Sequence, residues 1–358
     1  MRILPLSLVV LLAPIAAACW GATAPAPSAS AASDSRMQAV VVSAGRIQLR
    51  EVARPLAGTG QVLVKLRYAA VNPGDWKMAG GAADDPAAGA PVTAAAAAAA
   101  SIDPAAMPTI PGVDGAGVIT AVGAGVVGYH IGDAVIVWSQ ARGTYAQYVA
   151  VPADTITLKP DRLSFAEAAG MAHAALAAWN LLLDVAQLRA GQTLLVLGGA
   201  GGVGSAAVQI ARIKGARVIA TASARNADYL KGLGASTVID YGAQHFEDQL
   251  RAIDVALDTV DIDDAYRALA VLRRGGRLVS SVGLPSAAQC AARMVTCQRR
   301  TLTGTPPRLV LGQIAAWSQS GLFKVNIDRS FELTEVPKAW QYSQAGHTRG
   351  KSVIRITE

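Results

Sequence analysis

The chain has few of the residues that build several common kinds of protein. Its 358 residues include three cysteines and four phenylalanines. Three cysteines are too few for a disulfide-built scaffold or a cysteine-rich zinc site, and so few phenylalanines argue against an aromatic-rich all-β protein. Only 16% of the residues are charged, while 52% are hydrophobic. This composition predicts sizeable buried cores in a chain long enough for two domains.

The chain also lacks a dense basic run, although its formal net charge is +7. The closest groupings are the arginine pairs at 273–274 and 299–300. Nucleic-acid binding is therefore not predicted, because such binding needs clustered Lys and Arg. A diffuse basic surface favours a polyanionic cofactor instead.

Cys290 and Cys297 are predicted to be free thiols. If both lay on one helix, the rise of seven residues would separate them by about 10 Å, which is too far for a disulfide without rearrangement. Buried cysteines commonly act as small hydrophobic residues. We therefore expect them to fill the core rather than to perform redox chemistry.

The first 18 residues have the order of a secretory signal. Arg2 precedes an apolar run over 3–15, and small residues at 16–18 precede Cys19. A cysteine directly after such a run resembles a bacterial lipoprotein box, so membrane anchoring through a lipidated Cys19 is an open alternative to simple export.

Residues 19–36 are rich in Pro, Ala and Ser and predict a disordered tether. We expect a periplasmic or membrane-anchored protein from this N-terminal pattern. The alternative is that Met37, which opens a β-like run, is the true start; the protein would then be cytoplasmic.

Two kinds of patterning divide the rest of the chain. Residues 37–159 contain short β-like runs separated by Gly, Pro and Asp, which predict an antiparallel, barrel-like module. An alanine-rich, low-complexity insertion at 79–107 interrupts it and favours a mobile loop. From 160 to 307 strands alternate with helices, as in a doubly wound parallel sheet. Residues 308–358 are expected to return to the first module. Helices in the second part are expected at 202–214, 225–233, 244–251 and 263–272.

A glycine loop follows the first strand of the second part. Residues 198–204 read GGAGGVG, after the apolar run TLLVL and before a helix-like stretch. In this context such a loop turns tightly, lets the backbone approach a pyrophosphate and presents helix N–H groups to it. The residues expected to bind a dinucleotide are Gly199, Ala200, Gly201, Gly202, Val203 and Gly204.

The end of the next strand predicts NADPH rather than NADH. Residues 221–226 read TASARN, without the Asp or Glu that would bind an adenosine ribose 2′-hydroxyl. Ser223 and Arg225 can both donate to a 2′-phosphate instead. The missing acid matters more than Arg225, because an exposed arginine is commonly only solvated.

Several segments together resemble the medium-chain dehydrogenase/reductase superfamily, and within it the zinc-free quinone oxidoreductase branch. The resemblance runs from Met37 to Glu358 in the family's order. It implies a GroES-like catalytic domain, a Rossmann domain in an α/β fold, NADPH-dependent reduction of quinones, activated enones or aldehydes, and, by analogy, a homodimer. The segments are AAVNPGDWK (69–77), IPGVDGAGVITAVGAGVVGYHIGDAVI (110–136), GTYAQYVAVP (143–152), GGAGGVGSAAVQIA (198–211), LGASTVIDY (233–241) and GHTRGKSVI (346–354).

No metal site is expected. The zinc branch places a His ligand in a Gly-His-Glu triplet, whereas residues 112–114 read GVD, and no cysteine lies between 20 and 289. Without a Lewis acid an unactivated alcohol is a poor substrate, whereas a quinone or an α,β-unsaturated carbonyl accepts hydride directly.

The resemblance places Asn72, Asp75 and Trp76 at a cleft between the two domains. Asn72 is expected to hydrogen-bond near the acceptor oxygen. Asp75 is equally consistent with a structural cap or turn residue, and Trp76 with core packing.

The resemblance also implies contacts between the cofactor and the C-terminal half. Lys351 is expected to reach back from the last strand, with a solvated lysine at a strand edge as the alternative. Ala177 stands where the family commonly has Thr, so one cofactor contact is lost. His173 is interpreted as either a pocket donor or a satisfied core residue. The other contacts are Tyr241 near the adenosine phosphate, Thr259 and Val260 after the fourth strand, and Val282 and Gly283 at the nicotinamide.

Two alternative functions stay open. An enoyl-thioester reductase would need a long channel with a basic rim, which the sequence does not reveal. An exported nucleotide-binding protein of the same fold with little turnover is suggested by the signal-like N-terminus, since reduced nucleotides are scarce outside the cytoplasm, and by Ala177.

Overall fold

Two β-sheets and one helix between them position the candidate site residues. The computed structural model describes residues 35–43, 46–79, 109–301 and 304–357. From Arg36 to Glu358 the chain forms one compact unit. The predicted signal at 1–18, nearly all of the tether at 19–36 and nearly all of the insertion at 79–107 lie outside the described residues.

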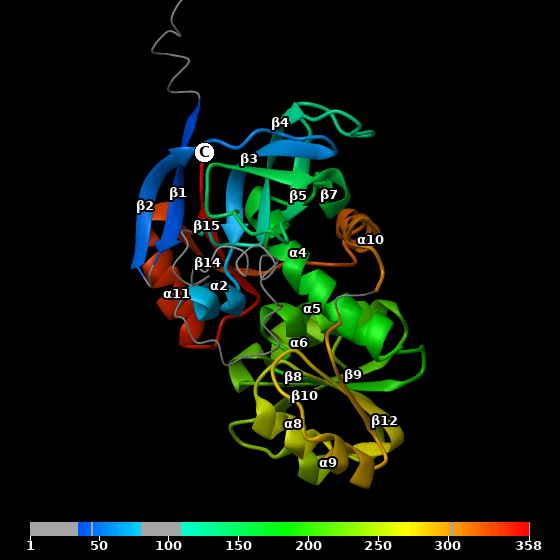
Figure 1. Cartoon of the computed structure of the whole chain (residues 1–358). Coiled ribbons are helices and arrows are strands. Elements are labelled where there is room, and N and C mark those ends of the chain that lie inside the picture. The colour runs from blue at the N-terminus through cyan, green and yellow to red at the C-terminus, as the bar shows by residue number, and fades with distance from the viewer. Residues whose placement is uncertain (1–34, 44–45, 80–108, 302–303, 358) are drawn as a thin grey trace, which may run out of the picture. The chain divides into compact units, whose positions relative to one another are not determined.

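The first sheet is mostly antiparallel. Within the described residues its order is β14-β15-β3-β4-β5-β7, with β6 paired to β3 (Figure 1). The pairing of β15 with β3 confirms that the C-terminal strand returns to the first module. The strands are β3 (Gln61–Ala70), β4 (Asp114–Val122), β5 (Ala134–Trp138), β6 (Tyr148–Pro152), β7 (Ile156–Leu158), β14 (Ile327–Glu332) and β15 (Lys351–Arg355).

A hairpin lies against this sheet. Its strands are β1 (Arg36–Ser43) and β2 (Arg46–Ala53). Single bridges from Ala39 to Ala146 and from Val42 to Thr109 attach it to the module. The first strand begins one residue before Met37, so the predicted tether ends slightly too late.

The second sheet is parallel and doubly wound, as predicted. Among the described residues its order is β10-β9-β8-β11-β12-β13, which is the 3-2-1-4-5-6 order of dinucleotide-binding folds. All carboxyl ends therefore share one edge, where ligands bind in such folds. The strands are β8 (Thr193–Leu197), β9 (Arg217–Ala222), β10 (Thr237–Asp240), β11 (Ile253–Asp258), β12 (Leu272–Ser280) and β13 (Thr296–Arg299).

The crossover helices of the second sheet are α5 (Gly202–Ile213), α6 (Ala227–Leu233), α7 (Phe246–Gln249), α8 (Ile262–Ala268) and α9 (Ala287–Ala292). Two predicted helices were too long. The stretch 244–251 keeps a single turn, in which only Phe246 is buried, and one anchor does not hold a longer helix. The stretch 263–272 stops at Ala268, because Leu272 already belongs to β12. The stretch 225–233 begins as a 3₁₀ turn, η4 (Ala224–Asn226).

The helix between the sheets is α4 (Phe165–Trp179), extended by a π-helical segment, η3 (Asn180–Val185). A capping box between Ser164 and Glu167 starts it. It packs against β3 and β4 on one side and against α5 on the other. Over 165–185 it is apolar and long enough to cross a membrane, but 67% of its apolar 18-residue window is buried inside the protein. It is therefore interpreted as a core helix.

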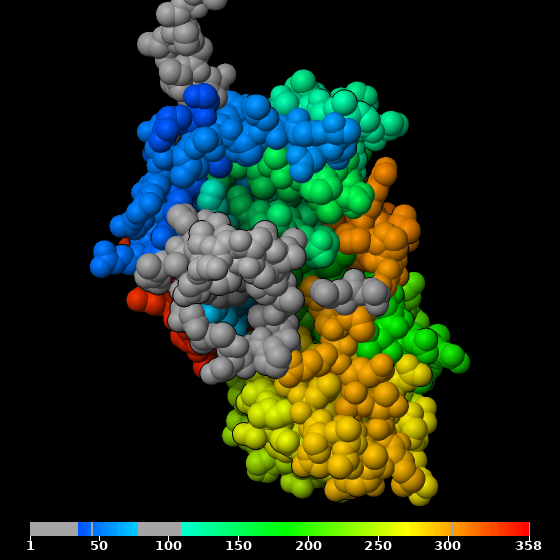
Figure 2. All heavy atoms as spheres, in the orientation of Figure 1, coloured from blue at the N-terminus to red at the C-terminus, as the bar shows by residue number. Residues whose placement is uncertain are grey.

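Figure 2 shows the surface formed by the second half of the parallel-sheet region, coloured yellow to orange.

Shorter elements complete the fold. The remaining helices are α2 (Pro73–Ala79), α10 (Pro307–Gln319) and α11 (Val336–Gln344), with 3₁₀ turns η2 (Ala153–Thr155) and η5 (Leu333–Glu335).

The prediction of two free thiols is wrong, because Cys290 and Cys297 form a disulfide. The two residues do not share a helix. The chain leaves α9 after Ala292, passes through Met294 with a φ of 53°, and places Cys297 on β13. Their Cα atoms are consequently 6.1 Å apart, within the range that a disulfide bridges.

Candidate active site

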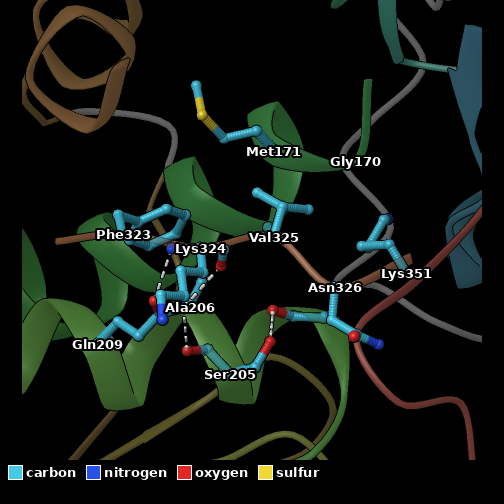
Figure 3. A pocket seen from close by; sticks show the side chains of 13 residues that line it. Gly170, Met171, Ser205, Ala206, Gln209, Phe323, Lys324, Val325, Asn326 and Lys351 are labelled. Carbon is cyan, nitrogen blue, oxygen red and sulfur yellow. Dashed lines mark hydrogen bonds between the residues drawn. The ribbon is translucent and has the colours of Figure 1, made fainter. Parts of the chain in front are cut away.

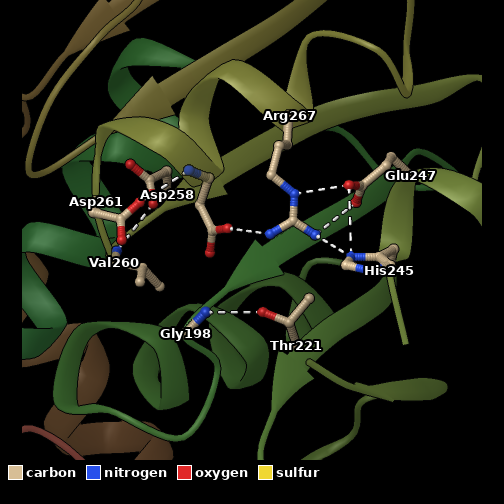
Figure 4. Close-up of polar contacts among 9 residues, drawn as sticks. Gly198, Thr221, His245, Glu247, Asp258, Val260, Asp261 and Arg267 are labelled. Atoms are coloured by element: carbon tan, nitrogen blue, oxygen red, sulfur yellow. Dashed lines mark hydrogen bonds and ion pairs between the residues drawn. The ribbon is translucent and has the colours of Figure 1, made fainter. Parts of the chain in front are cut away.

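The glycine loop is held between the ends of β8 and β9. Gly199 N donates to Thr221 O over 2.9 Å, and Gly198 N donates to Thr221 Oγ1 over 3.2 Å (Figure 4). Gly201 is the N-cap of α5, with no side chain to cap the first turn. Val203 lies in that turn. The first N–H groups of α5 thus keep their need for an acceptor.

The glycines of the loop differ in the space that a side chain would have at each position. A Cβ on Gly204 would lie 2.2 Å from Gly198 O, and one on Gly199 would lie 2.8 Å from Ala220 Cβ. A Cβ on Gly201 would meet no described atom closer than 3.6 Å. Packing therefore requires the first and third glycines of the motif, while the middle one leaves room that the protein does not use. A dinucleotide fits this arrangement, because the middle glycine is the one a pyrophosphate approaches.

The loop after β9 carries the predicted phosphate-binding side chains. Ser223 Oγ accepts a hydrogen bond from Asn226 Nδ2 over 3.1 Å. Arg225 is exposed, and its Nη2 donates to His347 O over 3.1 Å. Arg225 is therefore tied to the C-terminal segment rather than merely solvated.

Asp258, at the end of β11, orders two loops predicted to contact the cofactor, of which the one with Val282 and Gly283 was expected at the nicotinamide. Its Oδ1 accepts from Val260 N over 2.9 Å (Figure 4), and its Oδ2 accepts from Ser280 Oγ over 2.9 Å. Ser280 Oγ in turn accepts from Val282 N over 3.1 Å and from Gly283 N over 3.2 Å. Burial raises the pKa of Asp258 to about 6. Asp258 was not among the predicted site residues, although a carboxylate at the end of a central strand was a usable signal.

Thr259 and Tyr241 occupy different surroundings. Thr259 Oγ1 donates to Leu197 O over 2.8 Å, and it would lie 2.7 Å from a Cβ on Gly198. Thr259 therefore packs directly on the glycine loop. Tyr241 follows β10 and is 53% exposed, so it has room to contact a ligand from the surface.

Lys351 is buried, with 6% of its surface exposed, so the alternative of a solvated lysine is wrong. Its Nζ donates to Asn72 Oδ1 over 2.6 Å and to Val71 O over 2.9 Å. On the way its Cδ passes 2.7 Å from the position of a Cβ on Gly202. Lys351 thus connects the start of α5 with the predicted catalytic asparagine.

Asn72 is buried and its amide is held at both ends. Oδ1 accepts from Lys351, and Nδ2 donates to Asp114 Oδ2 over 3.1 Å. Asp114 Oδ1 accepts from the backbone N–H of His173, in the middle of α4, over 2.9 Å. Since an amide nitrogen has two N–H groups, one of them is left to donate elsewhere.

Asp114 and Lys351 form a buried pair of opposite charges, with Oδ2 and Nζ 3.8 Å apart. Burial raises the pKa of Asp114 to about 6, while the nearby Lys351 charge opposes that rise. Burial lowers the pKa of Lys351, and the two carboxylates Asp114 and Asp75 oppose this change. Asp114 was not predicted as a site residue; its position had served only as evidence against a zinc ligand.

Asp75 and Trp76 contact other protein groups. Asp75 is buried, and its Oδ2 accepts from Asn72 N over 2.9 Å and from Tyr145 OH over 2.8 Å. These bonds correspond to the capping alternative. Trp76 is half-buried, and its Nε1 donates to Ser343 Oγ over 3.2 Å, which corresponds to the packing alternative.

His173 and Ala177 lie on α4 near this cluster. Burial holds the pKa of His173 well below its usual value, and the charges of Arg300, Lys351 and Arg142 act in the same direction. Its imidazole is therefore neutral near pH 7. Ala177 is 2% exposed, so it offers only a methyl group.

Gln209 lines a small cavity between α4 and α5, and its amide already has hydrogen-bond partners within the protein (Figure 3). Gln209 Nε2 donates to Ser205 O over 3.2 Å and to Lys324 O over 2.9 Å, and its Oε1 accepts from Lys324 N over 2.8 Å. This cavity therefore reflects how α5 is attached to residues 323–326 rather than a ligand site.

The described part of the chain brings no three His, Cys, Asp or Glu side chains together as a metal ion would require. Asp114, which lies next to the position of the zinc branch's histidine, uses both carboxylate oxygens to accept hydrogen bonds from Asn72 and from the backbone of His173.

Two family descriptions match the chain. Residues 58–161 match the alcohol dehydrogenase GroES-like domain, and residues 233–354 match the zinc-binding dehydrogenases. The first match covers the antiparallel module, and the second covers much of the parallel sheet and the C-terminal return.

Named relatives cover most of the chain. A 2-methylene-furan-3-one reductase from Solanum lycopersicum is 35% identical over 85% of this chain and 74% of its own. An NADPH-dependent alkenal/one oxidoreductase of Arabidopsis thaliana is 32% identical over 82% of this chain and 72% of its own. The solved structure of an alcohol dehydrogenase superfamily protein from Novosphingobium aromaticivorans superposes with a TM-score of 0.78 at 31% identity, covering 90% of this chain and 100% of that chain.

Proposed function

Because the chain belongs to the medium-chain dehydrogenase/reductase superfamily, we propose that it reduces α,β-unsaturated carbonyl compounds or quinones with NADPH and without zinc. Membership makes it an oxidoreductase of an NAD(P)-binding family. The observation that carries the finer proposal is the buried Lys351–Asn72–Asp114 arrangement beside the start of α5. It fixes an amide donor next to the predicted nucleotide site.

The relatives support the acceptor class. One is named for a methylene-furanone, in which a carbonyl is conjugated to a C=C bond, and the other for alkenals and alkenones, which contain both groups. A quinone contains the same conjugated unit. Such acceptors take hydride at carbon while negative charge develops on the carbonyl oxygen.

When bound, NADPH supplies the hydride. The remaining N–H of Asn72 Nδ2 donates to the acceptor oxygen, where negative charge develops. Lys351 and Asp114 hold the Asn72 amide in the orientation that presents its nitrogen. The Lys351 ammonium also draws electron density toward Oδ1, which makes the N–H groups of the amide better donors.

The residues after β9 support NADPH as the cofactor, and residue 113 supports a reaction without zinc. The loop 221–226 has no carboxylate, and Ser223 and Arg225 both lie on it. Val113 stands where the zinc branch has a histidine ligand, and an aliphatic side chain does not bind metal.

The decisive test is an assay of the purified chain in three separate reactions: NADPH with an enone, NADPH with a quinone, and NADP⁺ with a simple alcohol. We expect turnover with the conjugated acceptors, unchanged after chelation of metals. Turnover of the alcohol alone, or activity that chelation removes, would contradict the proposal.

The matched variant is Asn72→Ala, with Gln319→Ala as a control that removes an amide from α10. We expect Asn72→Ala to lower kcat by roughly 100-fold, the range for losing an oxyanion donor, with NADPH binding nearly unchanged. An unchanged kcat in Asn72→Ala would remove Asn72 from the proposed mechanism.

We also infer that the protein is exported from the cytoplasm to a compartment where its turnover would depend on NADPH being supplied. A Cys290–Cys297 disulfide suits an oxidising compartment, and the order of residues 1–18 is that of an export signal. Fractionation of cells should recover the protein in the periplasm or at the membrane, with a disulfide in its intact mass. Lipid on Cys19 would identify the membrane as its location. Recovery of a reduced, cytosolic protein beginning at Met37 would refute the inference.

A further inference from the structure

Residues 347–351, here called the C-terminal strap, contact three parts of the candidate site in turn. At one end the strap meets the loop after β9. In its middle, Gly350 N donates to Ala200 O of the glycine loop over 2.8 Å. At its other end, Lys351 reaches Asn72. The strap therefore follows the carboxyl edge of the parallel sheet, although it leads into β15 of the other sheet.

Arg349 is the strap residue that reaches the loop after β9. Its Nε donates to Asn226 Oδ1 over 2.8 Å, and its Nη2 donates to Arg225 O over 3.0 Å. Its guanidinium carbon lies 5.7 Å from the centre of the Tyr229 ring. Two hydrogen bonds and a ring face thus orient a half-buried planar group.

This guanidinium joins the side chains already expected to meet a 2′-phosphate. Asn226, which accepts from Arg349, donates to Ser223 Oγ. Arg225, whose carbonyl accepts from Arg349, donates in turn to His347 O on the strap. Ser223, Arg225 and Arg349 therefore belong to one small hydrogen-bonded network.

The network carries two positive charges without a neutralising carboxylate. Within the described residues, neither Arg225 nor Arg349 lies within 4 Å of an Asp or Glu oxygen. The described bonds use only Nε and Nη2 of Arg349 and only Nη2 of Arg225. Two guanidinium groups with N–H groups to spare, one on the loop after β9 and one on the strap, favour a doubly charged phosphate.

We propose that Arg349 determines cofactor specificity by binding the adenosine 2′-phosphate of NADPH together with Ser223 and Arg225. The inference rests on the proposed function, which places a dinucleotide along this edge. It adds a group from the segment that leads into β15 of the antiparallel sheet, whereas the expected phosphate ligands all lie on loops that follow strands of the parallel sheet.

The test uses cofactor fragments, so that it does not depend on turnover. Binding of 2′,5′-ADP and of 5′-AMP to the full chain is measured by calorimetry, for the wild type and for Arg349→Met. We expect the wild type to prefer 2′,5′-ADP. Arg349→Met should weaken 2′,5′-ADP binding by about 10- to 100-fold, for the loss of a charge-assisted contact, and change 5′-AMP binding by less than twofold.

Two further variants separate charge from geometry. Arg349→Lys keeps the charge and the stem but loses the fork, and should bind 2′,5′-ADP with intermediate affinity. Arg329→Met is the matched control, because Arg329 is exposed on the neighbouring β14 and lies 4.5 Å from the Tyr342 ring. It should leave both affinities unchanged.

The outcomes distinguish this inference from the proposed function. Equal losses for both fragments in Arg349→Met and Arg349→Lys would make Arg349 a structural residue and overturn the inference. A full preference for 2′,5′-ADP in Arg349→Met would overturn it as well, while the NADPH proposal would stand. Equal affinity of the wild type for both fragments would overturn the NADPH preference itself.

Discussion

Gly201 and Gly204 lie three residues apart in one loop, yet substituting them should have different consequences, one for cofactor binding and the other for stability. A Cβ at 204 would lie 2.2 Å from Gly198 O, so Gly204→Ala must move backbone and should lower the unfolding free energy by several kcal/mol. Gly201 has a φ of −71° and space for a Cβ, so Gly201→Ala should leave stability within about 1 kcal/mol.

Cofactor titration completes this first prediction. Gly201→Ala should weaken NADPH binding by tenfold or more despite its stability, because its methyl group would occupy the space of the pyrophosphate. Urea unfolding and fluorescence titration give the two numbers. Normal NADPH binding by a stable Gly201→Ala protein would mean that the loop is only a turn.

A second prediction at this scale concerns Asp258 and pH. Burial raises its pKa to about 6, from about 4 for an unperturbed Asp, so between these pH values the folded state holds more protons than the unfolded state. Stability therefore falls as pH rises from about 4 to 6. Asp258→Asn should reduce this slope and, because Val260 N or Ser280 Oγ loses its acceptor, cost about 1–3 kcal/mol.

The measurement is urea unfolding of both proteins at pH 4, 5, 6 and 7. Burial raises the pKa of Asp114 to about 6 and also raises that of Asp75, so part of the slope should persist in the variant. A slope identical to that of the wild type would show that Asp258 does not take up a proton in this window.

At the scale of elements, the sequence predicted those strands and helices whose apolar residues recur with the period of a strand or a helix. The strands β8 to β12 follow buried apolar runs, and the residues between them fit crossovers. The strand β13, with the sequence TCQR, has no buried residue, so neither it nor the short helix before it had an apolar signal. The disulfide was missed for this reason, since a helix was assumed where the chain turns at Met294.

The candidate site divides in the same way. The glycine loop and Asn72 are local motifs and were recognised. Asp114 lies 42 residues from the asparagine it accepts from, and Lys351 lies 279 residues from it, so only the folded chain brings these three groups together.

The disulfide gives a prediction at this scale. It closes a loop with a sequence separation of seven between α9 and β13, for which chain entropy gives about 2.5 kcal/mol. Replacing both cysteines by alanine should lower the unfolding free energy by about this amount, with NADPH affinity unchanged. A reducing agent should reproduce the loss in the wild type and have no effect on the variant; an equal response of both proteins would contradict a structural role.

At the scale of the whole molecule, Lys351 links the two sheets through a single buried charge. Lys351→Met removes the cation that lowers the pKa of Asp114, so that pKa should rise further. At a pH below this raised pKa, Asp114 of the variant is protonated and carries no charge, so its burial beside the introduced methionine costs little stability. At a higher pH the buried carboxylate is charged and unpaired, which lowers the unfolding free energy by about 3–5 kcal/mol. The variant should therefore lose stability relative to the wild type as pH rises.

Thermal unfolding of Lys351→Met and the wild type at pH 5 and pH 8 checks this fourth prediction. Lys338→Met, which removes an exposed lysine paired with Glu335 on α11, serves as the control and should behave like the wild type. An equal loss at both pH values would assign Lys351 a packing role without an electrostatic one.

The strap has a consequence for recombination between related chains. Gly350 pairs with Gly201, and a side chain at 350 would collide with Asn326 O at 2.3 Å, so the nucleotide edge is assembled from segments that lie about 150 residues apart. A chimera that received only residues 160–307 would inherit the glycine loop and leave Arg349 and Lys351 behind. Its cofactor preference would then depend on the segment that precedes the last strand of the host.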